Sequence, residues 1–226
     1  MRGMTEPQKL TLAIDVGTTV SALLMQPAKA RALYVFAHGA GAGMTHRAMT
    51  EIAEGLADRG VATLRYQFPY MERGSKRPDP PKVAHAAVRA AVAEAAKTDL
   101  PLFAGGRSFG GRMTSQAQAE HALPGVRGLI FLGFPLHPAG KPSIDRADHL
   151  AEVLIPMLFL QGARDELASL DLLEPVVHAL GARAQLDLFE HADHSFHVPA
   201  RSGRTDAQVR EAVLAAMTHW IERRLS

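Results

Sequence analysis

Residues 100–110 read LPLFAGGRSFG, and this stretch decides the fold of the chain. Its apolar start predicts a short strand, and the residues after Ser108 predict a helix. Gly106 and Gly110 flank Ser108, which lets the backbone double back while the serine is held in a strained conformation above the sheet. The N–H of Phe109, at the start of the helix, can then face a developing oxyanion. The alternative is a glycine-rich turn that only packs the helix on the sheet.

Short apolar segments and helical patterns alternate along the chain. The predicted strands are residues 10–14, 20–25, 32–37, 61–66, 100–104, 126–132, 157–160 and 185–189. The predicted helices are residues 46–59, 83–97, 109–121, 170–180 and 205–224. A short turn predicts that the first two strands pair antiparallel, and every later pair is expected to be parallel because its connection has the length of a helix. We predict an α/β fold: one domain over residues 1–226, with an eight-stranded, mostly parallel sheet covered by helices on both faces.

The composition limits the possible chemistry and partners. The sequence contains no cysteine, so a nucleophile must use oxygen or nitrogen. Residues 1–9 lack the apolar run of a targeting segment, and no apolar stretch approaches the ~18 residues that cross a bilayer, so we expect a cytoplasmic protein without a membrane partner. The densest basic cluster is Arg73, Lys76 and Arg77. It lacks interleaved aromatic residues, which favours a solvated loop over a contact with nucleic acid or an anionic substrate.

A second glycine-rich segment, HGAGAG at residues 38–43, follows one of the predicted strands. In an α/β sheet, a turn at this place can bring another backbone N–H, that of Ala40 or Gly39, to the same oxyanion as Phe109. The segment lacks the G-x-G-x-x-G spacing of a dinucleotide site and the Gly-Lys-Ser/Thr ending of a phosphate loop. We therefore predict no nucleotide cofactor.

A serine nucleophile needs an imidazole to accept its proton and a carboxylate to fix the tautomer of that imidazole. The strand at 157–160 runs into a loop that contains Asp165 and Glu166. We predict Asp165 as the acid because it comes sooner after Gly162, whose freedom at positive φ would allow a sharp turn, and Glu166 is the alternative. His194, in the loop after the last strand, is the predicted base, which completes the chain order Ser, acid, His.

Three histidines, His191, His194 and His197, lie in this last loop. Their spacing suggests a metal site, but no fourth ligand or H-E-x-x-H pattern accompanies them, so we predict no metal. His194 suits the role of base because it lies far enough past the strand for the loop to reach back over the sheet. His38 is expected to support the oxyanion loop through hydrogen bonds.

The connection at residues 133–156 is too short for the large helical lid of a lipase. We therefore expect an open or lightly covered site that takes a small acyl substrate. Tyr70, Phe134, Leu136 and Phe109 are candidates to line it, and the alternative for these residues is ordinary packing in the core.

Segments 106–112, 133–142 and 191–196 together give the chain a resemblance to the α/β-hydrolase superfamily over essentially its whole length. The chain is similar to the small dienelactone-hydrolase-like members, but it carries Ser108 where dienelactone hydrolases carry a cysteine. It also resembles a little-characterised branch of the superfamily. This branch includes bacterial predicted hydrolases and a eukaryotic chromatin-complex subunit. The resemblance implies the α/β-hydrolase fold and its catalytic machinery, and it does not indicate the substrate.

Two functions from different classes are compatible with these observations. The first is a cofactor-independent serine hydrolase of carboxylesterase type, in which Ser108 attacks a carboxylic ester or thioester and forms an acyl-enzyme. The second is a non-catalytic binding or scaffold protein on the same fold, as the eukaryotic relative suggests. We favour the enzyme, because a scaffold has no physical need for Ser108, Asp165 and His194 together.

Overall fold

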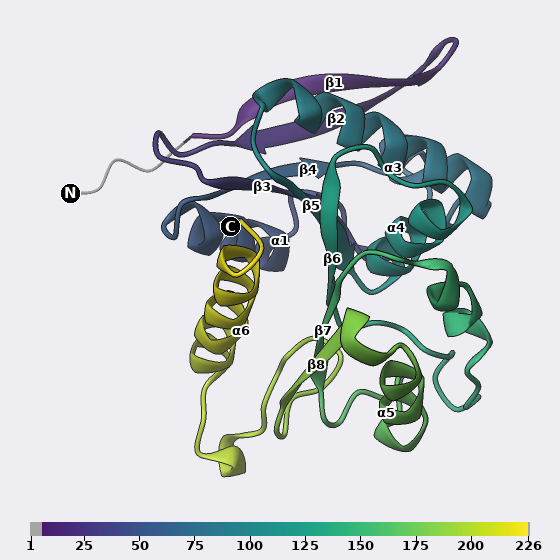
Figure 1. The fold of residues 1–226 in the computed structure, drawn as a ribbon, viewed down its shortest axis with the longest axis vertical. Coiled ribbons are helices and arrows are strands. Elements are labelled where there is room, and N and C mark those ends of the chain that lie inside the picture. The colour runs from purple at the N-terminus through teal and green to yellow at the C-terminus, as the bar shows by residue number, and fades with distance from the viewer. Residues whose placement is uncertain (1–5, 226) are drawn as a thin grey trace.

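The computed structural model describes residues 6–225, which form one mixed sheet of eight strands with helices packed against it (Figure 1). The strands are β1 (Gln8–Asp15), β2 (Thr18–Met25), β3 (Ala32–Ala37), β4 (Val61–Tyr66), β5 (Leu102–Arg107), β6 (Val126–Leu132), β7 (Met157–Gly162) and β8 (Ala184–Phe189). Their order across the sheet is β1-β2-β4-β3-β5-β6-β7-β8. Residues 1–5, which belong to the segment in which we expected no targeting signal, lie outside the described residues.

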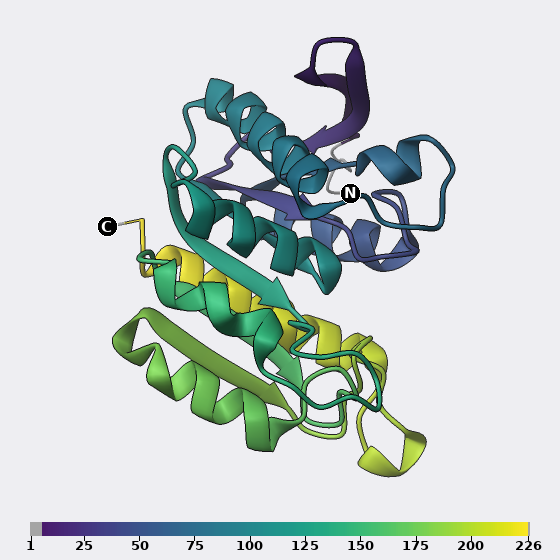
Figure 2. The ribbon, with the colours of Figure 1, turned by 90° about the vertical axis from the view of Figure 1, so that its right-hand side faces the viewer.

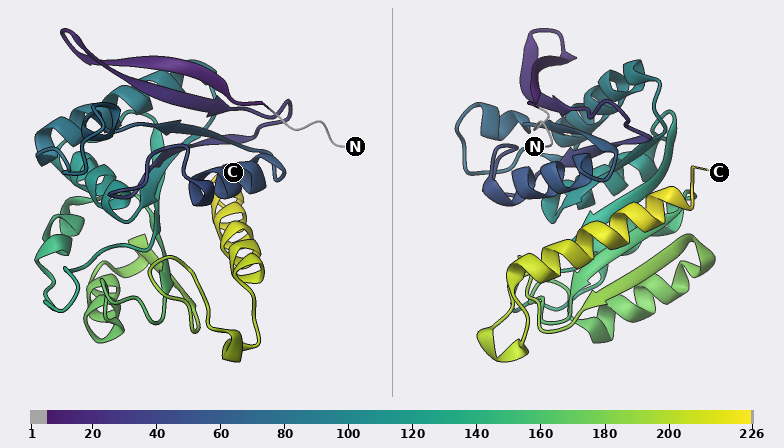
Figure 3. Two further views of the ribbon diagram at one scale, coloured as in Figure 1. Left: turned by 180° about the vertical axis from the view of Figure 1, so that it is seen from behind. Right: turned by 90° about the vertical axis from the view of Figure 1, so that its left-hand side faces the viewer.

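Helices cover both faces of the sheet, as predicted. They are α1 (Arg47–Ala57), α2 (Pro69–Glu72), α3 (Pro81–Ala95), α4 (Phe109–Glu120), α5 (Leu170–Ala179) and α6 (Asp206–Glu222). Figures 1 and 2 show α3, α4 and α5 on one face, and the views of Figure 3 show α1 and α6 on the other. Each face has its own hydrophobic cluster, with Val88 and Met113 on the first face and Ile52 and Trp220 on the second.

The pairing of the strands agrees with the sequence at the hairpin and differs at β2. The strands β1 and β2 pair antiparallel, as expected. The expectation of parallel pairing for every later pair is wrong for β2, which pairs antiparallel with β4. Residues 26–31 between β2 and β3 are too few for a parallel crossover, which needs about a dozen residues or more. The chain therefore leaves a gap between β2 and β3, and β4 fills it, parallel to β3.

The connection from β6 to β7, residues 133–156, contains a 3₁₀ segment, Asp145–Glu152. No large lid rises from it within the described residues, which agrees with the prediction from its length. Of the helices between residues 6 and 225, none is long and apolar enough to span a membrane.

The turn from β5 to α4 brings the backbone into direct contact with the end of β3. A Cβ placed on Gly106 would lie 2.8 Å from the Cβ of Ala37 and closer still to its carbonyl oxygen. A Cβ placed on Gly110 would lie 2.7 Å from the carbonyl carbon of Ala37. Most of these obstacles are backbone atoms, which cannot rotate away as a side chain can. The two glycines of the motif are therefore required by the packing of backbone on backbone.

We expect Gly106→Ala to lower the free energy of unfolding by about 3 kcal/mol, because its Cβ overlaps the backbone of β3. Gly203→Ala is the control: Gly203 has a φ of 70°, and a Cβ there meets nothing within 4 Å. Its substitution should cost only about 1 kcal/mol of left-handed strain. Denaturant unfolding of both variants measures the difference, and equal losses would contradict the packing argument.

Candidate active site

Ser108 lies at the sharp turn between β5 and α4, as the motif predicts. Its backbone has φ 46° and ψ −117°, a conformation that a residue with a side chain rarely adopts. Its N–H donates to the carbonyl of Leu132 at 3.1 Å, which ties the turn to the end of β6. Its hydroxyl makes no hydrogen bond to another residue of the described chain, 6–225, so it is available for a new partner.

A pocket of about 450 Å³ opens beside Ser108. Its lining includes Ala40 and Phe109, and their backbone N–H groups donate to no acceptor between residues 6 and 225. Gly39 packs on the serine, since a Cβ there would lie 3.7 Å from the Ser108 Cβ, but it does not line the pocket. Two unused N–H groups beside an unused hydroxyl can hold an oxyanion. Of the two residues expected to donate from this loop to an oxyanion, Ala40 is better placed than Gly39 because it lines the pocket.

Asp165 and His194 meet at the same edge of the sheet. The Nδ1 atom of His194 lies 2.7 Å from Oδ2 of Asp165. Because a carboxylate accepts hydrogen bonds, Nδ1 carries a proton, and in the neutral imidazole Nε2 then has a free lone pair. The imidazole lies over Gly133, since a Cβ there would be 3.3 Å from ring atoms Nδ1 and Cε1. Gly133 directly follows Leu132, whose carbonyl accepts the hydrogen bond from the N–H of Ser108. The imidazole and the serine therefore both lie at the end of β6.

A buried hydrogen-bond network holds Asp165. Its side chain is fully buried, its Oδ1 accepts from the N–H of Leu167 at 2.8 Å, and its Oδ2 also accepts from Nε2 of Gln161. Gln161 in turn accepts from the N–H of Phe134 at 2.9 Å through Oε1. Glu166, the alternative acid, is exposed. The sequence analysis missed Gln161, although a glutamine in an otherwise apolar strand was the available signal.

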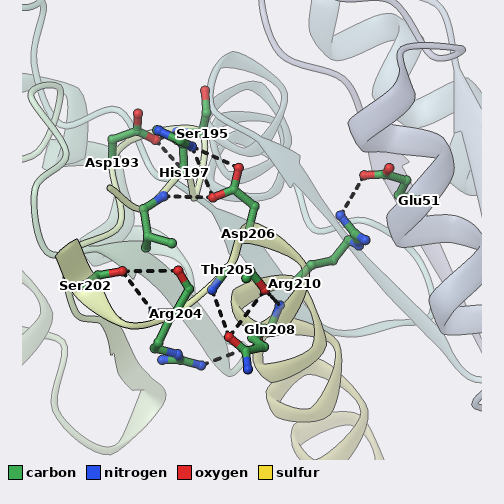
Figure 4. A network of polar contacts seen from close by, with 11 residues as sticks. Glu51, Asp193, Ser195, His197, Ser202, Arg204, Thr205, Asp206, Gln208 and Arg210 are labelled. Carbon is green, nitrogen blue, oxygen red and sulfur yellow. Dashed lines mark hydrogen bonds and ion pairs between the residues drawn. The ribbon is translucent and has the colours of Figure 1, made fainter. Parts of the chain in front are cut away.

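Hydrogen bonds also fasten the loop that carries His194 (Figure 4). A side-chain oxygen of Asp193 accepts from the N–H groups of Ser195 at 2.7 Å and His197 at 3.0 Å. The imidazole of His197 lies 2.9 Å from a carboxylate oxygen of Asp206, the first residue of α6. The loop is therefore anchored within itself and to α6.

Gly162 supports this loop differently from the way we expected. The expectation of a positive φ is wrong, since Gly162 is not among the residues with positive φ. Instead, a Cβ there would lie 2.5 Å from the carbonyl oxygen of Ala192 and closer to that of Asp193. Glycine is needed because the backbone of the loop passes directly over the end of β7. The positive φ angles occur at His191 and Phe196, 62° and 63°, on either side of the predicted base.

The other two histidines of the loop have surroundings that differ from those of His194. His191 is exposed, and His197 forms the ion pair with Asp206, which raises the pKa of His197. Within residues 6–225, no group of three or more histidine, aspartate or glutamate side chains could hold a metal ion.

His38 has the hydrogen bonds expected of a residue that supports the oxyanion loop. It is fully buried, and its Nε2 accepts from the N–H of Phe68 at 3.0 Å. Its Nδ1 therefore carries the proton, which it donates to the carbonyl of Gly39 at 2.8 Å. Burial lowers the pKa of His38 to about 4. A neutral imidazole thus holds the Gly39 carbonyl and leaves the N–H groups of the loop unengaged.

Of the four residues considered for the lining, Phe109 lines the pocket, and the other three are found in the core. Tyr70, Phe134 and Leu136 are fully buried members of one hydrophobic cluster. Their neighbours Phe109 and Pro135 line the pocket. The ring of Tyr70 packs edge-on against Phe109, with 6.2 Å between ring centroids. The three residues pack behind those that line the pocket. Burial of their apolar surface in the core is more favourable in free energy than exposure to water in the pocket.

A family model described as an alpha/beta hydrolase domain matches residues 30–222. The chain belongs to this family. The match includes the serine turn, the glycine-rich loop at residues 38–43, the loop of Asp165 and the loop of His194, so the structural elements described above are those of an α/β hydrolase.

Solved structures support the fold of this α/β hydrolase over nearly its whole length. A dienelactone hydrolase from Anabaena variabilis is 22% identical with a TM-score of 0.75, and the match covers 98% of this chain and 100% of that one. The esterase domain of a Rhodothermus marinus protein is 18% identical with a TM-score of 0.75, covering 98% and 100%. An α/β serine hydrolase without lid from Xanthomonas campestris is 21% identical with a TM-score of 0.72, covering 96% and 95%.

The opposite environments of two histidines generate a prediction about pH. His38 should stay neutral until the pH falls to about 4, whereas His197 should titrate above its ordinary range because of Asp206. The unfolded chain protonates His38 near pH 6.5 and the folded one does not, so the contribution of His38 to stability is complete above 6.5 and lost as the pH falls toward 4. That loss amounts to about 3 kcal/mol. NMR titration of the two imidazoles measures both values, and a His38 that titrates near 6.5 would contradict the buried, neutral assignment.

Proposed function

We propose that this α/β hydrolase is a serine hydrolase that cleaves small carboxylic esters or thioesters through an acyl-enzyme. The observation that carries the proposal is the 2.7 Å contact between Asp165 and His194, at the same end of β6 as a strained serine with an unused hydroxyl. In the proposed reaction Asp165 stays ionised and holds the Nδ1–H of His194. The free Nε2 then accepts the proton of Ser108.

The proposed reaction has two halves. Ser108 Oγ attacks the carbonyl carbon while its proton moves to His194 Nε2, and the carbonyl oxygen becomes an oxyanion that accepts from the N–H groups of Phe109 and Ala40. The bond to the leaving oxygen or sulfur then breaks, and His194 gives that atom the proton. In the second half, water loses a proton to the same imidazole and attacks the acyl carbon. Collapse releases the carboxylic acid and returns the proton to Ser108.

The pocket supports a small substrate. Its volume of about 450 Å³ is in the range of small-molecule sites, and the short connection between β6 and β7 leaves it without a large cover among the described residues. The esterase domain and the serine hydrolases with a similar fold support this class of reaction.

A scaffold function is less well supported by the local geometry. The backbone strain at Ser108 costs on the order of 1–3 kcal/mol, which a non-catalytic protein has no reason to retain. The buried network around Asp165 likewise orients an imidazole that a scaffold does not need.

The nucleophile is tested by Ser108→Ala. The variant should keep the fold, fail to react with a fluorophosphonate probe and lose ester hydrolysis by about 10⁴-fold or more. Ser195→Ala is the matched control, because this exposed serine lies next to His194 in the chain. Labelling and the rate on a short-chain 4-nitrophenyl ester measure the effect. A Ser108→Ala variant with the full esterase rate would disprove the assignment.

The acid is tested by two neighbouring substitutions. Asp165→Asn should lower kcat by up to about 10⁴-fold, because the amide cannot hold His194 in the required tautomer. Glu166→Gln should change kcat little, because its side chain is exposed. Kinetics of both variants on one activated ester decide between them, and the reverse order of effects would move the acid to Glu166.

A further inference from the structure

Two arginines line the pocket beside Ser108 and lie close to each other. Arg112 is on α4, one turn after the serine, and its backbone N–H donates to the carbonyl of Ser108 at 3.1 Å. Arg146 is on the 3₁₀ segment between β6 and β7. Both are half-buried. Burial lowers the pKa of the Arg112 guanidinium, and the nearby positive charge of Arg146 lowers it further.

Neither guanidinium has an acidic partner in the described part of the chain. Neither residue forms an ion pair within residues 6–225, and the Nε of Arg112 is buried without a hydrogen-bond partner. Asp79 is the acidic residue among those that line the pocket, and its charge is paired with Arg73 of the loop that we expected to be solvated. His149, which faces Arg112, is neutral at pH 7, because burial lowers its pKa to about 4.

The pocket therefore contains two positive charges that the surrounding protein leaves uncompensated. Two other half-buried arginines of this chain are paired with carboxylates, Arg59 with Glu211 and Arg210 with Glu51. Two unpaired guanidinium groups near each other are unfavourable, because each is partly desolvated and repels the other. An anion between them would remove the repulsion and satisfy the buried Nε, and the planar guanidinium suits carboxylate and phosphate oxygens.

We propose that Arg112 and Arg146 bind an anionic group of the substrate, so that this hydrolase prefers esters or thioesters whose acyl chain ends in a carboxylate or phosphate. The proposal rests on the proposed function for its reaction. Arg112 comes four positions after Ser108, a rise of about 6 Å along the helix, which corresponds to an acyl chain of a few carbon atoms. A half-ester of a short dicarboxylic acid has this length and charge.

The substrate preference is tested with two esters of equal chain length. These are the 4-nitrophenyl monoester of glutaric acid and neutral 4-nitrophenyl valerate. The kcat/KM of the wild type should favour the glutaryl ester by about tenfold or more, since a charge-assisted hydrogen bond contributes that much. Arg112→Gln and Arg146→Gln should each lower this ratio by about tenfold, mainly through a higher KM for the glutaryl ester. Arg201→Gln, at an exposed arginine on another segment, should leave both rates unchanged.

A binding measurement separates this proposal from the proposed function. Glutarate and inorganic phosphate should each raise the melting temperature of the Ser108→Ala protein, and Arg146→Gln in the same background should abolish the rise. A larger rise with phosphate would identify the group as phosphate, and a larger rise with glutarate as carboxylate. If no ester is hydrolysed but the anions bind through the arginines, the proposed reaction fails and the anion site stands. An unchanged ester ratio in both arginine variants, or no stabilisation by either anion, would overturn the anion site.

Discussion

The contact of bare backbone on backbone at the turn between β5 and α4 is the constraint on which the rest of the site depends. Gly106 and Gly110 lie so close to the end of β3 that a single methyl group does not fit. The chain can therefore turn within a few residues, and Ser108 takes up the strain with a φ of 46°. The same turn places the first N–H groups of α4 beside the serine, so one feature of packing positions both a hydroxyl and a donor.

The two loops that meet this turn obey the same constraint. Gly133 gives room to the ring of His194, and Gly162 gives room to the backbone that carries it. Since the parallel strands β5, β6, β7 and β8 end at one edge of the sheet, Ser108, Asp165 and His194 follow different strands and still lie at the same edge, where Asp165 and His194 are in contact. Side chains at these glycines would push the loops apart, so the site requires residues without a Cβ at positions 133 and 162.

The effect of burial on the charge of a side chain near the site depends on the type of residue. An imidazole can lose its proton, so His38 and His149 become neutral when buried and serve as hydrogen-bonding groups. A guanidinium cannot lose its proton at ordinary pH, so Arg112 and Arg146 keep their charges in the pocket. The carboxylate of Asp165 is fully buried but satisfied by Gln161, Leu167 and His194. The proposed acid is thus fully compensated, and the two arginines in the pocket are not.

The sequence by itself determined the α/β fold, its strands and major helices, and the positions of Ser108, Asp165 and His194 in loops at one edge of the sheet. These features follow from local rules, because apolar periodicity, glycine spacing and the direction of parallel strands are all written in neighbouring residues. Only the tertiary structure decided the place of β4 between β2 and β3, the role of Gly162, the burial of Tyr70, Phe134 and Leu136, and the pairing of Gln161 with Asp165. It also brought Arg112 and Arg146 together. Each of these depends on which distant segments come into contact, and a pattern of neighbouring residues does not encode the contacts that a side chain makes across the fold.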